Sequence, residues 1–174
     1  MLAEVAFFVV FAGWIVKTYV AYALSRRPTV QNLQLAVELD PSNAEYHLAL
    51  ARLYQYNIAD LQPEKALEHM RGAARLSPHN PQSWLELAAA LGFQGKTAEA
   101  EACLRRADLL APNVPAVQWP VANFYLLQGN VDEAFRHFRV LLAGTSQYDQ
   151  IVFNTAWKAS GYAEKILQEL IPRH

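Results

Sequence analysis

The sequence predicts an all-α protein in which an array of helical hairpins follows one membrane-spanning helix. Three observations lead to this prediction. The chain opens with a long apolar run, similar residues recur every 34 positions, and the apolar side chains between them follow helical spacing. The 174 residues have a net charge of −1, so no overall field favours nucleic acid as a partner.

The apolar run extends over residues 2–24 and contains only two charged residues, Glu4 and Lys17. As a helix it would be about 34 Å long, enough to cross a hydrocarbon layer of about 30 Å. Arg26 and Arg27 follow the run directly. We therefore predict a transmembrane anchor over residues 1–27.

Aromatic residues and one lysine of this anchor are the candidate contacts with lipid and with other membrane helices. Tryptophan and tyrosine favour the membrane interface. The lysine either extends to the headgroups or pairs with an acidic group of a partner inside the membrane. The candidates are Phe7, Phe8, Phe11, Trp14, Lys17, Tyr19 and Tyr22.

Two other interpretations of the apolar run stay open. The letters AYA at 21–23 fit a signal-peptide cleavage site, although no Lys or Arg precedes the apolar stretch. The second interpretation is a buried helix of a soluble protein, because the strictly uncharged stretch 5–16 is short for a membrane-spanning helix. As an anchor, the run predicts a single-pass protein of a bacterial inner membrane. The basic residues after the run place the rest of the chain in the cytoplasm, with the periplasm as the alternative.

The 34-residue period appears in several sets of positions at once. Small residues recur in the sets Ala66, Ala100, Ala134 and Gly95, Gly129, and prolines recur as Pro78, Pro112. Each unit has a first helix with large apolar residues, a turn, and a second helix in which small and large residues alternate along one face. The small residues let the antiparallel partner helix approach, and the proline ends the unit.

These positions resemble the 34-residue signature of the tetratricopeptide repeat family. The middle unit matches it at Trp84, Leu87, Ala88, Leu91, Ala100, Leu104, Ala107 and Pro112. The resemblance implies a solenoid over 28–146, with a half repeat at 29–41 and repeats at 44–78, 81–112 and 115–144. Residues 147–174 would form degenerate capping helices. Two departures stand out: three extra residues around NIADLQP in the first repeat, and Pro120, which predicts a kink or a late helix start near Trp119.

The resemblance also implies a groove lined by the first helix of each repeat, where a helix or an extended peptide would bind. The candidate residues are Glu45, Arg52, Gln55, Tyr56, Gln82, Phe93, Trp119 and Asn123. For Leu85, Leu126 and Leu127, burial against neighbouring helices and exposure in the groove are both open.

Sequence motifs give no indication of catalysis. The five histidines are scattered, no phosphate-binding or nucleophile motif occurs, and the single cysteine, Cys103, lies among alanines and leucines. We therefore expect neither an enzyme nor a cofactor, metal or small-molecule substrate. The predicted function is a membrane-anchored scaffold or assembly factor that binds protein partners. A permanently embedded accessory subunit of a respiratory or photosynthetic enzyme is the alternative.

Overall fold

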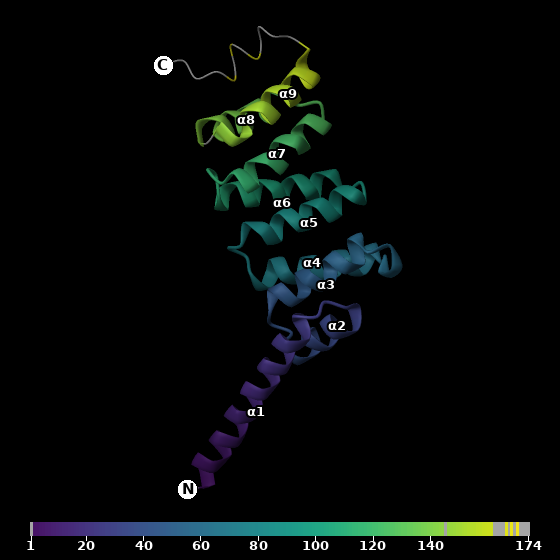
Figure 1. The fold of residues 1–174 in the computed structure, drawn as a ribbon, viewed down its shortest axis with the longest axis vertical. Coiled ribbons are helices and arrows are strands. Elements are labelled where there is room, and N and C mark those ends of the chain that lie inside the picture. The colour runs from purple at the N-terminus through teal and green to yellow at the C-terminus, as the bar shows by residue number, and fades with distance from the viewer. Residues whose placement is uncertain (1, 145, 162–165, 167, 169, 171–174) are drawn as a thin grey trace. The chain divides into compact units, whose positions relative to one another are not determined.

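The computed structural model describes residues 2–144, 146–161, 166, 168 and 170. These residues form α-helices joined by short turns, without a β-strand among them (Figure 1). The chain divides into two compact units, Met1–Pro78 with Ala89–Gly95 and His79–Ala88 with Lys96–His174. The helices are α1 (Leu2–Ser25), α2 (Val30–Leu39), α3 (Ala44–Tyr56), α4 (Pro63–Leu76), α5 (Pro81–Phe93), α6 (Thr97–Leu110), α7 (Pro115–Leu127), α8 (Val131–Gly144) and α9 (Asp149–Ser160).

The first unit begins with a hairpin between the end of α1 and α2. Ala21 is completely buried in one cluster with Ala36 of α2 and Tyr46 of α3. A short turn joins the two helices. Thr29 caps the start of α2, because its side-chain oxygen accepts a hydrogen bond from the backbone N–H of Asn32 at 3.2 Å. The predicted half repeat therefore has a partner helix, which is the C-terminal part of the apolar helix.

The pair α3 and α4 completes the first unit. Leu33, Leu50, Tyr54 and Ala66 form a shared core between α2, α3 and α4. The small residues of the second helix do what their spacing predicts, because Ala66 has no exposed surface and lets α3 approach closely.

The second unit has its main core between α7, α8 and α9. Phe135, Phe138 and Leu141 of α8 are fully buried, together with Val152 and Ala156 of α9. The same cluster includes residues 166 and 170 of the predicted cap. The remaining cap positions 162–165, 167, 169 and 171–174 lie outside the described residues.

Several expectations from the sequence can be compared with these elements. The array of helical hairpins is confirmed. The three extra residues form a longer turn that contains the 3-10 helix Ile58–Asp60. A late start of the third repeat near Trp119 is wrong, because α7 begins at Pro115 and continues through Pro120. Pro120 removes one backbone hydrogen bond of α7, the one that an N–H at this position would donate to the carbonyl of Ala116, which is an exposed residue.

The interpretation of the apolar run as a buried soluble helix is also wrong. Phe7, Phe8, Val9 and Val10 are each at least 65 % exposed, although they point in successive directions around α1. In Figure 1 this part of α1 extends away from the other helices of its unit. Among its described side chains, those buried against other helices lie in the last turns, at Ala21 and Leu24.

Candidate protein-binding surface

One face of α3 in the first unit presents the residues that the sequence assigned to a groove. Glu45, Arg52 and Tyr56 are exposed and lie at positions i, i+7 and i+11, which share one side of a helix. Gln55 is half-buried beside them. The opposite side of α3 carries Leu50 and the other buried residues, so packing of the core determines which face points outward.

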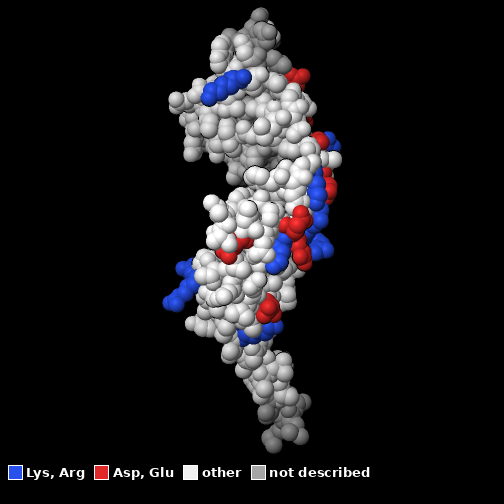
Figure 2. Space-filling view, turned by 90° about the vertical axis from the view of Figure 1, so that its right-hand side faces the viewer, with Lys and Arg blue, Asp and Glu red and all other residues white. Residues whose placement is uncertain are grey.

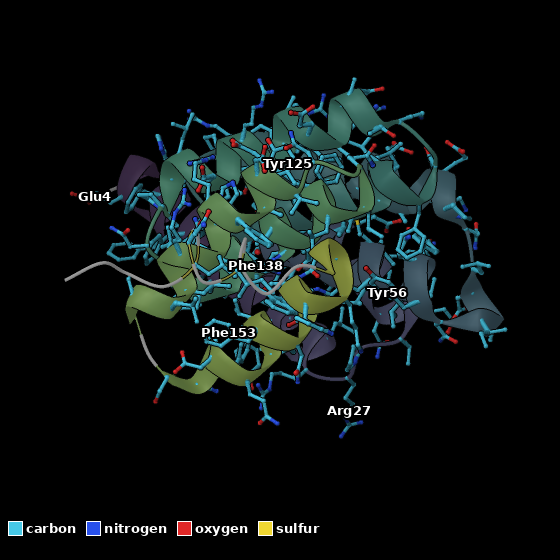
Figure 3. All side chains as sticks on the ribbon, turned by 90° about the horizontal axis from the view of Figure 1, so that it is seen from above. Glu4, Arg27, Tyr56, Tyr125, Phe138 and Phe153 are labelled. Atoms are coloured by element: carbon cyan, nitrogen blue, oxygen red, sulfur yellow. The ribbon has the colours of Figure 1, made fainter. Side chains whose placement is uncertain are left out.

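Two aromatic side chains of the first unit expose most of their surface. Tyr56, the last residue of α3, is 59 % exposed, and Phe93, the last residue of α5, is 74 % exposed. Figure 3 shows the Tyr56 ring standing out from the ribbon. Exposed aromatic rings bury a large apolar area when a partner covers them, and such residues often dominate binding energy.

The longer turn after α3 adds two apolar side chains that sequence reasoning missed. Ile58 is 93 % exposed and Leu61 is 55 % exposed. The turn is held in place by Asn57, whose side chain accepts from the Ala59 N–H at 3.2 Å and donates to Asp60 at 2.8 Å. The sequence did contain a signal for them, because the extra segment NIADLQP departs from the repeat pattern and still carries the apolar residues Ile58 and Leu61.

The end of α5 lies beside the start of α4 at this same end of the first unit. The Gln94 side-chain amide donates to the Pro63 carbonyl at 3.4 Å and to the Glu64 carboxylate at 3.3 Å. Gln94 directly follows Phe93, and Pro63 follows the turn that contains Leu61. These bonds therefore place Phe93 and the extended turn at one end of the unit. We call Tyr56, Ile58, Leu61 and Phe93 the apolar patch.

The second unit presents its three predicted residues differently. Gln82 is exposed and donates to Glu86 at 2.9 Å. Trp119 is partly buried, because its ring packs on Phe138 of the core at 5.9 Å between ring centroids. Asn123 donates its side-chain amide to the Trp119 carbonyl at 2.7 Å. Packing inside the unit therefore already uses part of Trp119 and Asn123.

The three leucines whose burial the sequence left open differ from one another. Leu85 is buried, Leu126 is partly buried and Leu127 is 85 % exposed. Leu127 is the last residue of α7, as Tyr56 is of α3 and Phe93 of α5. Each first helix of a repeat thus ends in an exposed, bulky apolar residue.

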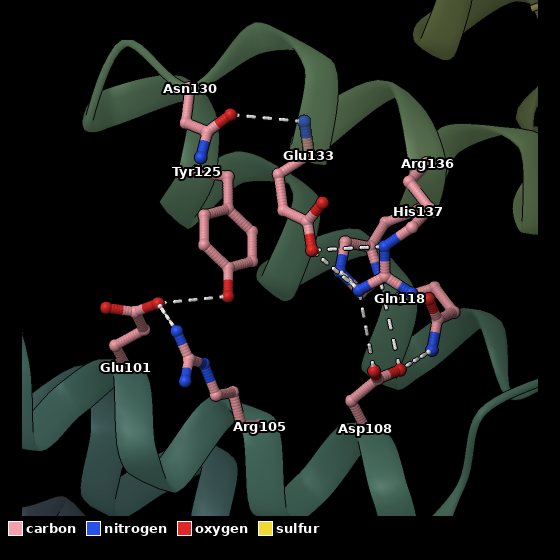
Figure 4. A network of polar contacts seen from close by, with 9 residues as sticks. All are labelled: Glu101, Arg105, Asp108, Gln118, Tyr125, Asn130, Glu133, Arg136 and His137. Carbon is pink, nitrogen blue, oxygen red and sulfur yellow. Dashed lines mark hydrogen bonds and ion pairs between the residues drawn. The ribbon is translucent and has the colours of Figure 1, made fainter.

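A polar network joins α6, α7 and α8 inside the second unit (Figure 4). His137 is buried, and its Nδ1 lies 2.6 Å from the side-chain oxygen Oε1 of Gln118, while the Gln118 side-chain amide donates to the Asp108 carboxylate at 2.6 Å. Arg136 donates to His137 Nε2 at 3.0 Å. This pattern fits a neutral imidazole with its proton on Nδ1, because Nε2 accepts a hydrogen bond.

The surroundings of His137 keep it neutral. Burial, followed by the charge of Arg136, lowers its pKa below the usual 6.5, and Asp108 and Glu133 oppose this shift. The Tyr125 ring stacks on the imidazole at 5.7 Å and 9°, and its hydroxyl donates to Glu101 at 3.2 Å. The network satisfies buried polar groups at the junction of three helices, a stabilising role.

Two histidines meet in the first unit. The Nδ1 atoms of His47 and His69 lie 3.0 Å apart, and burial together with His47 lowers the pKa of His69. A metal site needs further ligands, and no group of three or more His, Cys, Asp or Glu side chains with suitable geometry occurs among the described residues. Cys103 is a buried thiol, as its apolar neighbours in the sequence predict.

The side chains assigned to the membrane are all exposed on α1. They are Phe7, Phe8, Phe11, Trp14, Lys17, Tyr19 and Tyr22. Residues Ala6–Ser25 form a helix that is long and apolar enough to cross a membrane. On the face drawn in Figure 2, the white surface next to the grey lower end shows no Lys, Arg, Asp or Glu, whereas charged side chains gather higher up.

Comparison with known proteins identifies the repeats. Residues 58–119 match the family model described as tetratricopeptide repeat. No curated protein matches the chain.

Solved structures share the fold at low sequence identity. A crystal structure of MamA is 17 % identical, with a TM-score of 0.65 over 81 % of this chain and 82 % of that one. TTC0263, a thermophilic tetratricopeptide repeat protein of Thermus thermophilus, is 21 % identical, with a TM-score of 0.63 over 76 % of this chain and 72 % of that one. A second MamA structure is 15 % identical, with a TM-score of 0.60 over 92 % of this chain and 97 % of that one. These similarities show the fold, an array of helix-turn-helix repeats.

Proposed function

We propose that this protein is a membrane-anchored scaffold that binds protein partners and assists assembly of a bacterial membrane or envelope complex. The observation that supports it most directly is the apolar patch. Tyr56, Ile58, Leu61 and Phe93 are all more than half exposed at one end of the first unit. Isolated apolar side chains are normal on a protein surface, but a group that includes two aromatic rings favours a binding site.

The chemistry of the patch defines the kind of partner. The patch combines two aromatic rings with two aliphatic side chains, and Arg52 and Glu45 lie further back along α3 on the same side as Tyr56. An amphipathic helix or an extended peptide with apolar residues would cover the rings, while its polar groups would meet the charged residues. The tetratricopeptide repeat fold provides rigid helices for such a surface.

The anchor is supported by the composition and exposure of α1. Its large side chains are exposed in every direction before Lys17, which suits lipid on all sides better than one protein surface. Cleavage after AYA would remove Ala21, which is completely buried against α2 and α3. Retention of the helix therefore preserves the core of the first unit. By the positive-inside rule, the repeats lie in the cytoplasm.

The partners can be isolated by purifying the tagged full-length chain from host membranes in mild detergent and identifying co-purifying proteins by mass spectrometry. The variant Y56A/F93A should lose the partner that the wild type retains. The control is L76A, which removes an apolar side chain that is 42 % exposed on α4, outside the patch. Equal recovery of the partner with all three proteins would contradict binding through the patch. Recovery of the wild type in the soluble fraction would contradict the anchor.

A permanently embedded subunit of a membrane enzyme is the second candidate, and α1 is the observation that favours it. Phe7, Phe11 and Trp14 stack along one side of the helix, with ring centroids 6.1 Å apart in each step. Such a ridge can pack against other membrane helices, and Lys17 can pair with an acidic residue there. Stoichiometric co-purification with enzyme subunits that persists in Y56A/F93A would favour this candidate.

A further inference from the structure

The end of α1 has two opposed faces. Ala21 and Leu24, three residues apart, pack against α2. Tyr19 and Tyr22 point to the other side and are 69 % and 55 % exposed. Before Lys17 the helix has no packed face among its described side chains. A single continuous helix therefore belongs to the repeat core over its last turns and leaves the protein before them.

The hairpin returns the chain toward the apolar part of α1. Its turn is closed by backbone hydrogen bonds, from the Arg27 N–H to the Leu24 carbonyl at 3.1 Å and from the Thr29 N–H to the Arg27 carbonyl at 2.9 Å. Antiparallel packing puts Ala21 and Ala36 in one cluster. Lys17 precedes Ala21 by four residues along α1, and Asp40 follows Ala36 by four residues at the end of α2. Since both steps cover about 6 Å of rise, the end of α2 lies near the level of Lys17.

The end of α2 is polar. Glu38 is exposed, and the Asp40 carboxylate is half-exposed and accepts from the Ser42 hydroxyl at 2.8 Å. Carboxylates in a hydrocarbon layer are strongly unfavourable. If the hydrocarbon layer reached Arg26, as the length of the apolar run alone would place it, these groups would lie inside the membrane with the closed hairpin.

We propose that α1 leaves the hydrocarbon layer at Lys17 and that the α1/α2 hairpin holds the first unit directly on the lipid headgroups. This inference rests on the proposed membrane anchoring. Residues 2–16 then supply about 22 Å of helix, which is shorter than the hydrocarbon layer of about 30 Å, so the bilayer thins locally around α1. The Lys17 ammonium then lies at the phosphate level, and Trp14 and Tyr19 lie at the interface that such side chains favour. The turn at Arg26 and Arg27 lies about 12 Å further from the hydrocarbon, in the aqueous phase. No linker separates the anchor from the repeats, so the first unit has a fixed orientation on the membrane.

Spin-label accessibility on the full-length chain tests this boundary. Single cysteines are introduced in a C103A background at Phe11, at Ala23 and at Leu35, which are exposed in the structure. The labelled chain is reconstituted into phosphatidylcholine vesicles, and collisions with oxygen, which concentrates in hydrocarbon, are compared with collisions with a water-soluble nickel chelate.

We expect the label at position 11 to collide mainly with oxygen and the labels at positions 23 and 35 to collide mainly with the nickel chelate. If position 23 matches position 11, the hydrocarbon layer extends to Arg26 and the inference is wrong, while the anchor itself stands. If position 11 also collides mainly with the nickel chelate, the helix is not inserted and both proposals fail. The label at position 35 lies in α2, so it tests the membrane boundary without a substitution in α1. Collisions mainly with oxygen at this position would also contradict the inference.

Discussion

A matched pair of substitutions in α1 tests whether the end of this helix is part of the repeat core. Ala21 and Ala23 lie two residues apart in the same apolar run, but Ala21 is completely buried and Ala23 is exposed. We compare Ala21→Asp with Ala23→Asp. Both changes reduce the hydropathy of the run equally, so a helix that acted only as an anchor would respond equally to both.

The expected difference follows from the surroundings of Ala21. Its cluster partners, Ala36 and Tyr46, are 0 % and 9 % exposed. A carboxylate at position 21 would be buried beside apolar atoms without a basic partner in the cluster, which costs several kcal/mol. A loss of about 3 kcal/mol in the free energy of opening corresponds to roughly a hundredfold faster amide exchange. Ala23→Asp should change it by no more than about 0.5 kcal/mol.

Hydrogen exchange measured by mass spectrometry on the full-length chain in detergent micelles gives the readout. Peptides from α2 and α3 should exchange about a hundredfold faster in Ala21→Asp than in the wild type, and close to the wild-type rate in Ala23→Asp. Peptides from α8 serve as an internal reference from the second unit. Equal exchange of α2 and α3 in the two variants would refute the role of α1 in the core.

Three further predictions concern titration, turn geometry and the patch. Because burial lowers the pKa of His69 and His137, the unfolded chain binds protons that the folded chain does not. The stability therefore falls as the pH drops below about 6.5, by up to about 1.4 kcal/mol per pH unit for each histidine. Urea midpoints that stay constant between about pH 7.5 and 5.5 would contradict this. Gly95 has a positive φ of 71°, which is unfavourable for a residue with a Cβ atom, so Gly95→Ala should lower the free energy of unfolding by about 1 kcal/mol. In α5, an added Cβ at Gly92 meets no atom within 4 Å, so Gly92→Ala should raise the free energy of unfolding by about 0.5–1 kcal/mol. A melting temperature that is higher for Gly95→Ala than for Gly92→Ala would contradict the backbone conformations assigned to these two glycines. Ile58→Ser should leave thermal unfolding unchanged and weaken partner recovery, and undiminished recovery would remove this residue from the patch.

The repeats could be predicted because their packing depends on residue size at fixed intervals. Ala66, Ala100 and Ala134 are almost completely buried, as their 34-residue spacing indicates. Exposure of Tyr56 and Phe93 followed from the same register. The helical hairpin is a local structure, so periodicity in one sequence contains most of the information needed.

Other features depend on contacts that periodicity does not encode. The pairing of α1 with α2 was missed because the apolar run obscures its small packing residue, Ala21, among other apolar residues. Trp119 was assigned to a groove, yet its ring packs on Phe138, since an aromatic residue at a helix surface serves either purpose. The network around His137 brings together residues from three helices, and no short motif indicates it.

Photo-crosslinking from the apolar patch in living cells tests the central claim most directly. A photoreactive amino acid replaces Phe93 in the full-length chain, and the same residue replaces Leu76 as a control on α4. A discrete protein adduct from position 93 that is absent at position 76, and that disappears in the Y56A background, is the predicted result. No protein adduct at position 93, or the same adducts at both positions, would contradict binding of a partner through this surface.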